Sequence, residues 1–182
     1  PPAAEPLPHR REASSLSVGS LLALLPWLEE RRGHLAPLLP AMPHGLIHGD
    51  WIKRNMFWRG DEVASVIDFD LWNVAPLAFD LALALLPAGF DWPRVLAGDA
   101  EPNRPVLQAM REGYEAIRPL TPAERQGLPW LIETARFEFY LSAIHAALGR
   151  GAPEEADRFF ELLLATTRWF SLHPAASRSF FA

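Results

Sequence analysis

The side chains best suited to chemistry in this sequence lie in two short stretches close to each other. Asp50 is followed five positions later by Asn55, and Asp68 stands thirteen residues beyond Asn55. A carboxylate can orient a hydroxyl group and take its proton. Carboxylate and amide oxygens are also the hard ligands that Mg²⁺ requires beside a triphosphate. The residue types and their order therefore indicate phosphoryl transfer to a hydroxyl group.

Such chemistry requires a loop and a hairpin that bring these oxygens to one point. Leu46 and Ile47 predict a short strand just before Asp50. Residues 55–58 and 63–67 predict two further strands, with Gly60 and Asp61 in the turn between them. We therefore expect Asp50 to lie in a loop, and Asn55 and Asp68 to lie at the ends of a hairpin.

The rest of the chain predicts helices. Apolar residues recur at helical spacing near 77–87, 104–117, 121–148 and 154–171. Thr121, Pro122 and Glu124 are typical of a helix start. A further helix is expected from Ser17 to Gly33, with a kink at Pro26.

The loop resembles a known family of enzymes. An Asp followed five positions later by an Asn, and then an Asp after a hairpin, is the order found in protein kinases. His48-Gly49-Asp50, in place of His-Arg-Asp, resembles the aminoglycoside phosphotransferase and choline kinase-like family. The likeness covers roughly Leu46 to Leu148. The family's Pro-x-x-x-Asp-Leu-Ala helix start is matched by Pro76-Leu77-Ala78-Phe79-Asp80-Leu81-Ala82. Two further segments, Gly113-Tyr114-Glu115 and Arg118-Pro119-Leu120, are similar to bacterial type II homoserine kinases within that family.

The resemblance implies an α+β fold, the C-terminal lobe of a protein-kinase-like enzyme, mostly helical with a small β-hairpin that carries the catalytic and metal residues. It implies that Asp50 is the catalytic base and that Asn55 and Asp68 bind Mg²⁺ and, through it, ATP. It further implies that Asp80 supports the loop through its backbone. His48 could take part in the chemistry, but we expect it to support the loop through a structural hydrogen bond that fixes the turn. The expected activity is an ATP-dependent small-molecule kinase that acts on the hydroxyl of a metabolite or an aminoglycoside.

The same likeness divides the chain. Residues 1–16 hold four prolines before Ser17 and read as an interlobe linker or arm, and residues 17–182 read as the catalytic lobe. A kinase-like enzyme also needs a Gly-rich turn and a strand lysine over the phosphates. Neither precedes His48, so we expect the N-terminal nucleotide-binding lobe to be absent from this chain, which alone would be inactive.

Composition excludes several other classes. The net charge of −5, without a dense basic cluster, argues against nucleic acid as a partner. No apolar run approaches the roughly 18 residues that a membrane span needs, so we expect no membrane association and a cytoplasmic protein. The absence of cysteine excludes disulfides and thiolate metal sites.

Two other functions stay open at this point. The lobe could be a non-catalytic binding module, or the clustered carboxylates could serve a metal-dependent phosphohydrolase. The acceptor is not specified, and the role of Asp70 is open. The residues that could line an acceptor pocket are Trp51, Trp72, Trp130, Glu133, Arg136 and Glu138.

Overall fold

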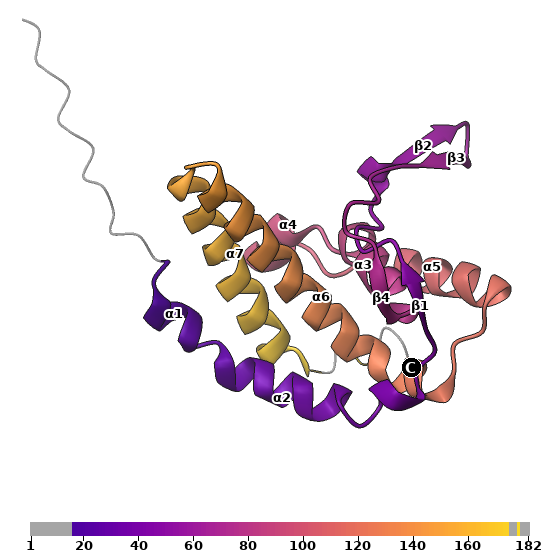
Figure 1. Ribbon diagram of the computed structural model, residues 1–182, viewed down its shortest axis with the longest axis horizontal. Helices are drawn as coiled ribbons and strands as arrows, with labels where there is room; N and C mark the ends of the chain where they lie inside the picture. Colours follow the sequence, from indigo (N-terminus) through magenta and orange to yellow (C-terminus); the bar gives the residue numbers. More distant parts are fainter. Residues whose placement is uncertain (1–15, 175–177, 179–182) are drawn as a thin grey trace, which may run out of the picture.

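The computed structural model describes residues 16–174 and residue 178. Helices form most of the described chain, and two small antiparallel sheets lie at one side (Figure 1). The elements in chain order are α1 (Val18–Leu22), α2 (Leu25–Leu35), η1 (Leu39–Ala41), β1 (His44–Ile47), η2 (Lys53–Asn55), β2 (Met56–Arg59), β3 (Glu62–Val66), β4 (Asn73–Pro76), α3 (Ala78–Gly89), α4 (Trp92–Ala97), α5 (Arg104–Ile117), α6 (Pro122–Gly149) and α7 (Pro153–Leu172).

The sheets frame the loop that carries Asp50. Strand β1 pairs antiparallel with β4, and β2 pairs antiparallel with β3 as a hairpin that projects from the helical body (Figure 1). The two strands predicted at 55–58 and 63–67 therefore form. The sequence did not predict β4, a four-residue strand that pairs with β1 across almost thirty residues of chain.

The helical body confirms the four predicted helices. Helices α6 and α7 run side by side in opposite directions, and α3 packs against α6 (Figure 1). At the start of α6, the Thr121 hydroxyl accepts from the Glu124 amide (3.3 Å) and the Glu124 carboxylate accepts from the Thr121 amide (2.9 Å). This reciprocal cap fixes the start of the longest helix. The six-residue helix α4 was not predicted.

The N-terminal helix differs from the prediction. The chain forms two helices, α1 and α2, instead of one kinked helix, and Pro26 takes the second position of α2. Proline has no N–H to donate and suits a first helical turn, so it starts a new helix there. Gly33 does not end the helix, because α2 continues to the buried Leu35. The predicted arm at residues 1–16 lies outside the described residues except for Leu16.

The core runs along α6. One part of it gathers α3, α5 and the N-terminal half of α6, and a second part gathers the C-terminal half of α6 with α7 and the start of the described chain. No helix in the described part of the chain is both long enough and apolar enough to cross a membrane.

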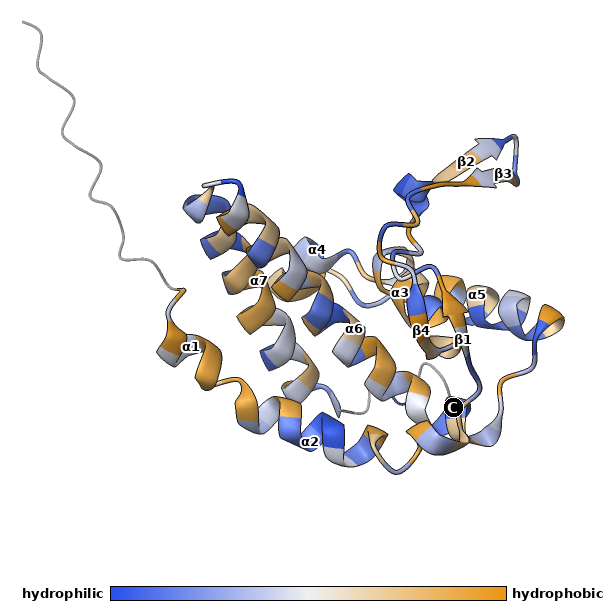
Figure 2. Cartoon of the chain, in the orientation of Figure 1, coloured by the Kyte–Doolittle hydropathy of each residue, from blue (hydrophilic) through white to orange (hydrophobic). Residues whose placement is uncertain are grey.

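A set of large apolar side chains lies outside this core. Figure 2 shows apolar residues on β1 and on β2 of the projecting hairpin. The exposed members between residues 46 and 74 are Leu46, Phe57, Trp58, Val63, Ile67, Phe69, Leu71, Trp72 and Val74. We call them the sheet-side apolar surface. An apolar surface of this kind is typical of a contact site for another folded unit.

Candidate active site

The loop from His48 to Asn55 is held to the helical body by Asp80. Its Oδ2 accepts from the His48 amide (2.8 Å), and its Oδ1 accepts from the Gly49 amide (3.0 Å). Asp80 lies in the first turn of α3, so the carboxylate also faces the positive end of that helix. Gly49 has a φ of 80°, and a Cβ there would collide with the Leu71 carbonyl. The loop is thus fixed at its first two residues.

Asp50 and Asn55 are in direct contact and both are buried. The Asn55 Nδ2 donates to the Asp50 Oδ2 (2.8 Å) and to the Asp50 main-chain carbonyl (2.9 Å). The exposed Arg54 lies 3.3 Å from the same Oδ2. Neither Asp50 Oδ1 nor Asn55 Oδ1 makes a hydrogen bond to another described residue.

His48 links this loop to the strand end before Asp68. Its Nδ1 accepts from the Asp50 amide (3.2 Å), which requires Nδ1 to be unprotonated. Its Nε2 therefore carries the hydrogen and donates to the Ile67 carbonyl (3.0 Å). The ring also packs against Phe69, with ring centroids 4.5 Å apart. His48 thus contacts the residues on both sides of Asp68.

Asp68 has an unusual backbone conformation. Its φ of 67° is the only positive φ among the non-glycine residues of the described chain. Its carboxylate is exposed and makes no hydrogen bond or ion pair with another described residue. The preceding residue, Ile67, is tied back to the loop because its amide donates to the Asn55 carbonyl (3.0 Å). Asp68 therefore follows directly on the residue that is bonded to Asn55. Asp70 is likewise exposed.

The unbonded oxygens of Asn55 and Asp68 suit a Mg²⁺ ion that is shared with a nucleotide better than a metal ion enclosed by protein ligands alone. Within the described residues, no group of three or more His, Cys, Asp or Glu side chains could enclose a metal ion. Mg²⁺ beside a nucleotide commonly takes one or two protein oxygens and completes its shell with phosphates and water. A pair of ligands is enough for that arrangement.

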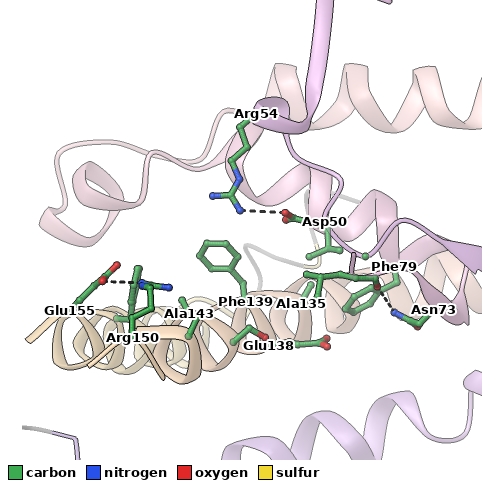
Figure 3. Close-up of a pocket in the computed structure, with 16 residues that line it drawn as sticks. Asp50, Arg54, Asn73, Phe79, Ala135, Glu138, Phe139, Ala143, Arg150 and Glu155 are labelled. Carbon is green, nitrogen blue, oxygen red and sulfur yellow. Dashed lines mark hydrogen bonds and ion pairs between the residues drawn. The ribbon is translucent and has the colours of Figure 1, made fainter. Parts of the chain in front are cut away.

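An open cavity extends from Asp50 along α6. Figure 3 shows Asp50 and Arg54 on one side and the α6 residues Ala135, Glu138, Phe139 and Ala143 on the other. Arg150 and Glu155, which form an ion pair (3.0 Å), stand at the far end. Partial burial at this wall raises the pKa of the Glu138 carboxyl. The cavity is large enough for a small polar molecule and has polar groups at both ends.

A second cavity lies beside the first, and Phe139 borders both. It shares Asp50, Arg54 and Leu83 with the first cavity, and it adds Arg136 of α6. Burial lowers the pKa of Arg136 to about 10, so the guanidinium still carries its charge at neutral pH.

The structure separates the proposed pocket residues into two groups. Arg136 and Glu138 line the cavities beside Asp50. Glu133 does not, because it is buried and paired with the buried Arg31 (2.8 Å). Trp130 also lies elsewhere, stacked on His34 with ring centroids 3.9 Å apart.

The other two tryptophans lie away from both cavities. Trp72 belongs to the sheet-side apolar surface. Trp51 lines a separate apolar cavity behind the loop, with Asp80 and Tyr114. Burial raises the pKa of the Tyr114 hydroxyl there, although Arg118 counteracts the effect.

Sequence reasoning missed Phe139, which borders both cavities beside Asp50, because its apolar side chain gave no functional signal.

The chain is similar in sequence to several homoserine kinases. The homoserine kinase of Methylobacterium nodulans is 36% identical over 143 residues, which make up 76% of this chain and 41% of that enzyme. The homoserine kinase of Phenylobacterium zucineum is 36% identical over 104 residues, 57% of this chain and 30% of the enzyme. A Caulobacter homoserine kinase is 32% identical over 138 residues, 75% of this chain and 40% of the enzyme. The chain thus spans less than half the length of these curated relatives.

The resemblance expected from the loop motif is confirmed at the level of the family. The model of the phosphotransferase enzyme family matches residues 1–120, which include the loop and Asp80. This match spans well over half of the chain, and the homoserine kinases above are also similar to more than half of it. The chain therefore belongs to the phosphotransferase enzyme family.

Proposed function

We propose that this chain forms the catalytic and acceptor-binding part of a small-molecule kinase, which transfers the γ-phosphoryl group of ATP to an alcohol. Homoserine is the first candidate acceptor, because the relatives with the matching region are homoserine kinases. The observation that carries the proposal is the Asp50 carboxylate, which Asn55 holds through Oδ2 in a residue that lines a cavity.

Asp50 would act as the catalytic base. The acceptor hydroxyl donates its hydrogen bond to Asp50 Oδ1, which orients the oxygen toward the γ-phosphorus. As the new P–O bond forms and the bond to the leaving ADP breaks, the hydroxyl proton passes to Asp50. Asn55 keeps the carboxylate in one orientation, and positioning of this kind supplies much of the catalytic effect.

Asn55 and Asp68 would hold Mg²⁺ through their free oxygens. The ion supplies positive charge against the phosphate oxygens when it is bound. His48 and Asp80 would act on the loop alone: His48 fixes the peptide of Asp50 and the carbonyl of Ile67, and Asp80 fixes the peptides of His48 and Gly49. Neither side chain needs to touch a substrate for this role.

The sheet-side apolar surface fits a nucleotide-binding lobe. We propose that such a lobe packs against the β-strands, above Asn55 and Asp68, and closes over the nucleotide. The support is that exposed apolar residues lie on the β-strands and in the loop after β3, while Asn55 directly precedes β2 and Asp68 follows β3. The relatives are more than twice as long as the matched region, which leaves room for a lobe in those enzymes.

The test is an acceptor screen with the complete gene product that contains this chain. The protein is incubated with Mg²⁺ and γ-labelled ATP in the presence of amino alcohols, hydroxy amino acids, sugars or aminoglycosides. Label transferred to one acceptor class supports the kinase. Label released to water in every pool would point to the phosphohydrolase, and no loss of ATP with retained nucleotide binding would point to the binding module.

A further inference from the structure

The second cavity beside Asp50 is strongly cationic. It has a volume of about 260 Å³ and brings Lys53 and Arg54 of the loop together with Arg136 of α6. Among the described residues, Asp50 is the only acidic one that lines it, and the other walls are apolar residues of α3 and α6 with Ile52. Three positive side chains around one carboxylate leave net positive charge in a small and mostly apolar space. Such a space favours an anionic ligand.

Arg136 is largely buried without an acidic partner among the described residues. Its guanidinium lies over Trp92 and Tyr140, with the central carbon 4.8 Å and 4.1 Å from the ring centroids. It donates a hydrogen bond to the Tyr140 hydroxyl, but its buried Nε has no acceptor within the described part of the chain. A buried donor without an acceptor is unfavourable, so a ligand that supplied an acceptor to this guanidinium would be stabilising.

Arg31 shows how this chain treats a buried arginine that has only a structural role. Arg31 also lies over a ring, with its central carbon 4.1 Å from the Trp27 centroid. Unlike Arg136, it donates from Nε to the carboxylate of Glu133 (2.8 Å). The Nε of Arg136 meets no such carboxylate and belongs to a side chain that lines the cavity next to Asp50.

We propose that Arg136, assisted by Lys53, binds a carboxylate of the acceptor, so that the acceptor is a hydroxy acid or hydroxy amino acid. The inference rests on the proposed function, because it places the acceptor hydroxyl at Asp50. A guanidinium presents paired N–H donors that match the two oxygens of a carboxylate. A nucleotide phosphate fits less well, because neither Asn55 nor Asp68 lines this cavity.

Calorimetry with two ligands of the same shape tests the proposal. L-Homoserine and 3-aminopropan-1-ol differ by the carboxylate alone, and each is titrated into the complete protein with Mg²⁺ and a non-hydrolysable ATP analogue. Wild-type protein binds homoserine more tightly. Arg136→Met, which keeps the length of the side chain, weakens homoserine by about 10–100-fold, the range for losing a hydrogen bond to a charged group. Its affinity for aminopropanol is unchanged.

Two further variants make the result specific. Arg136→Lys keeps the charge and retains part of the preference for homoserine. Arg168→Met removes an exposed arginine of α7 that lines neither cavity, and it leaves both affinities unchanged. If Arg136→Met does not fold, Lys53→Met on the exposed loop replaces it and lowers the affinity for homoserine several-fold without affecting aminopropanol.

Each other outcome overturns a defined statement. Equal affinities of the wild-type protein for the two ligands, or equal losses in Arg136→Met, would show that Arg136 has a structural role. Weaker binding of the ATP analogue alone would assign the cationic cavity to the nucleotide. Homoserine could bind in an Arg136-dependent way in calorimetry and yet receive no label from γ-labelled ATP in the acceptor screen. That result would support the carboxylate site and refute the proposed kinase.

Discussion

Removal of the Asp80 carboxylate is expected to loosen the catalytic loop. Asp80→Ala deprives the amides of His48 and Gly49 of their acceptor, in bonds of 2.8 Å and 3.0 Å. A hydrogen bond to a charged group contributes about 1.5–3 kcal/mol when it is shielded. Asp80 is only partly buried, so water replaces some of the lost interaction. The expected loss in free energy of unfolding is therefore about 1–3 kcal/mol.

Thermal and urea unfolding of the 182-residue chain measure this loss. For a chain of this length, each kcal/mol corresponds to a shift in Tm of about 2–4 °C, so the shift should be about 2–12 °C. Asp80→Asn keeps one acceptor oxygen and should lie between wild type and Asp80→Ala. Asp99→Ala removes an exposed carboxylate next to α4 and serves as the control. Unfolding curves of Asp80→Ala and Asp99→Ala that coincide would refute the anchoring role.

Three further results are expected. In the complete protein, Asp50→Asn should lower turnover by about 10²–10⁴-fold while nucleotide affinity is retained, as steady-state rates and calorimetry would show; turnover near the wild-type value would exclude Asp50 as the base. Asp68→Ala should abolish the Mg²⁺ dependence of nucleotide binding, and an unchanged Mg²⁺ titration would count against the metal role. Gly49→Ala should destabilise the chain by more than about 1 kcal/mol in urea unfolding, because φ is positive there and the new Cβ meets the Leu71 carbonyl. Gly113→Ala lies in open space on α5 and should instead stabilise the chain by about 0.5–1 kcal/mol in the same assay.

Local signals predicted most of the fold. Apolar periodicity located α5, α6 and α7, and the turn at Gly60 and Asp61 located the hairpin, because each signal lies within one element. Elements that depend on a distant partner were missed. Strand β4 exists because β1 pairs with it, and α4 because Trp92 and Val95 are buried against the core. Neither contact is encoded by a nearby pattern.

The same distinction holds for the candidate site. Motif spacing selected Asp50, Asn55, Asp68 and Asp80, and the structure brings Asn55 to Asp50. Their catalytic and metal-binding roles remain predictions until activity is measured. The surroundings of charged residues on α6 could not be read from spacing. Glu133 and Arg136 lie three residues apart, yet only Arg136 reaches the cavity, because α2 brings Arg31 to Glu133.

The hydrogen bonds of His48 connect the two halves of the proposed site. One ring nitrogen accepts from the amide of Asp50, and the other donates to the carbonyl that precedes Asp68. With Nδ1 as the acceptor and Nε2 as the donor, one imidazole holds both segments. The positive φ of Asp68 is uncommon for a residue other than glycine, although aspartate tolerates it better than most. Ile67 and Phe69 both contact His48, so the imidazole holds the chain on both sides of Asp68. A single histidine therefore links the loop of the proposed base to the segment of the proposed metal ligand, and its role needs no contact with a substrate.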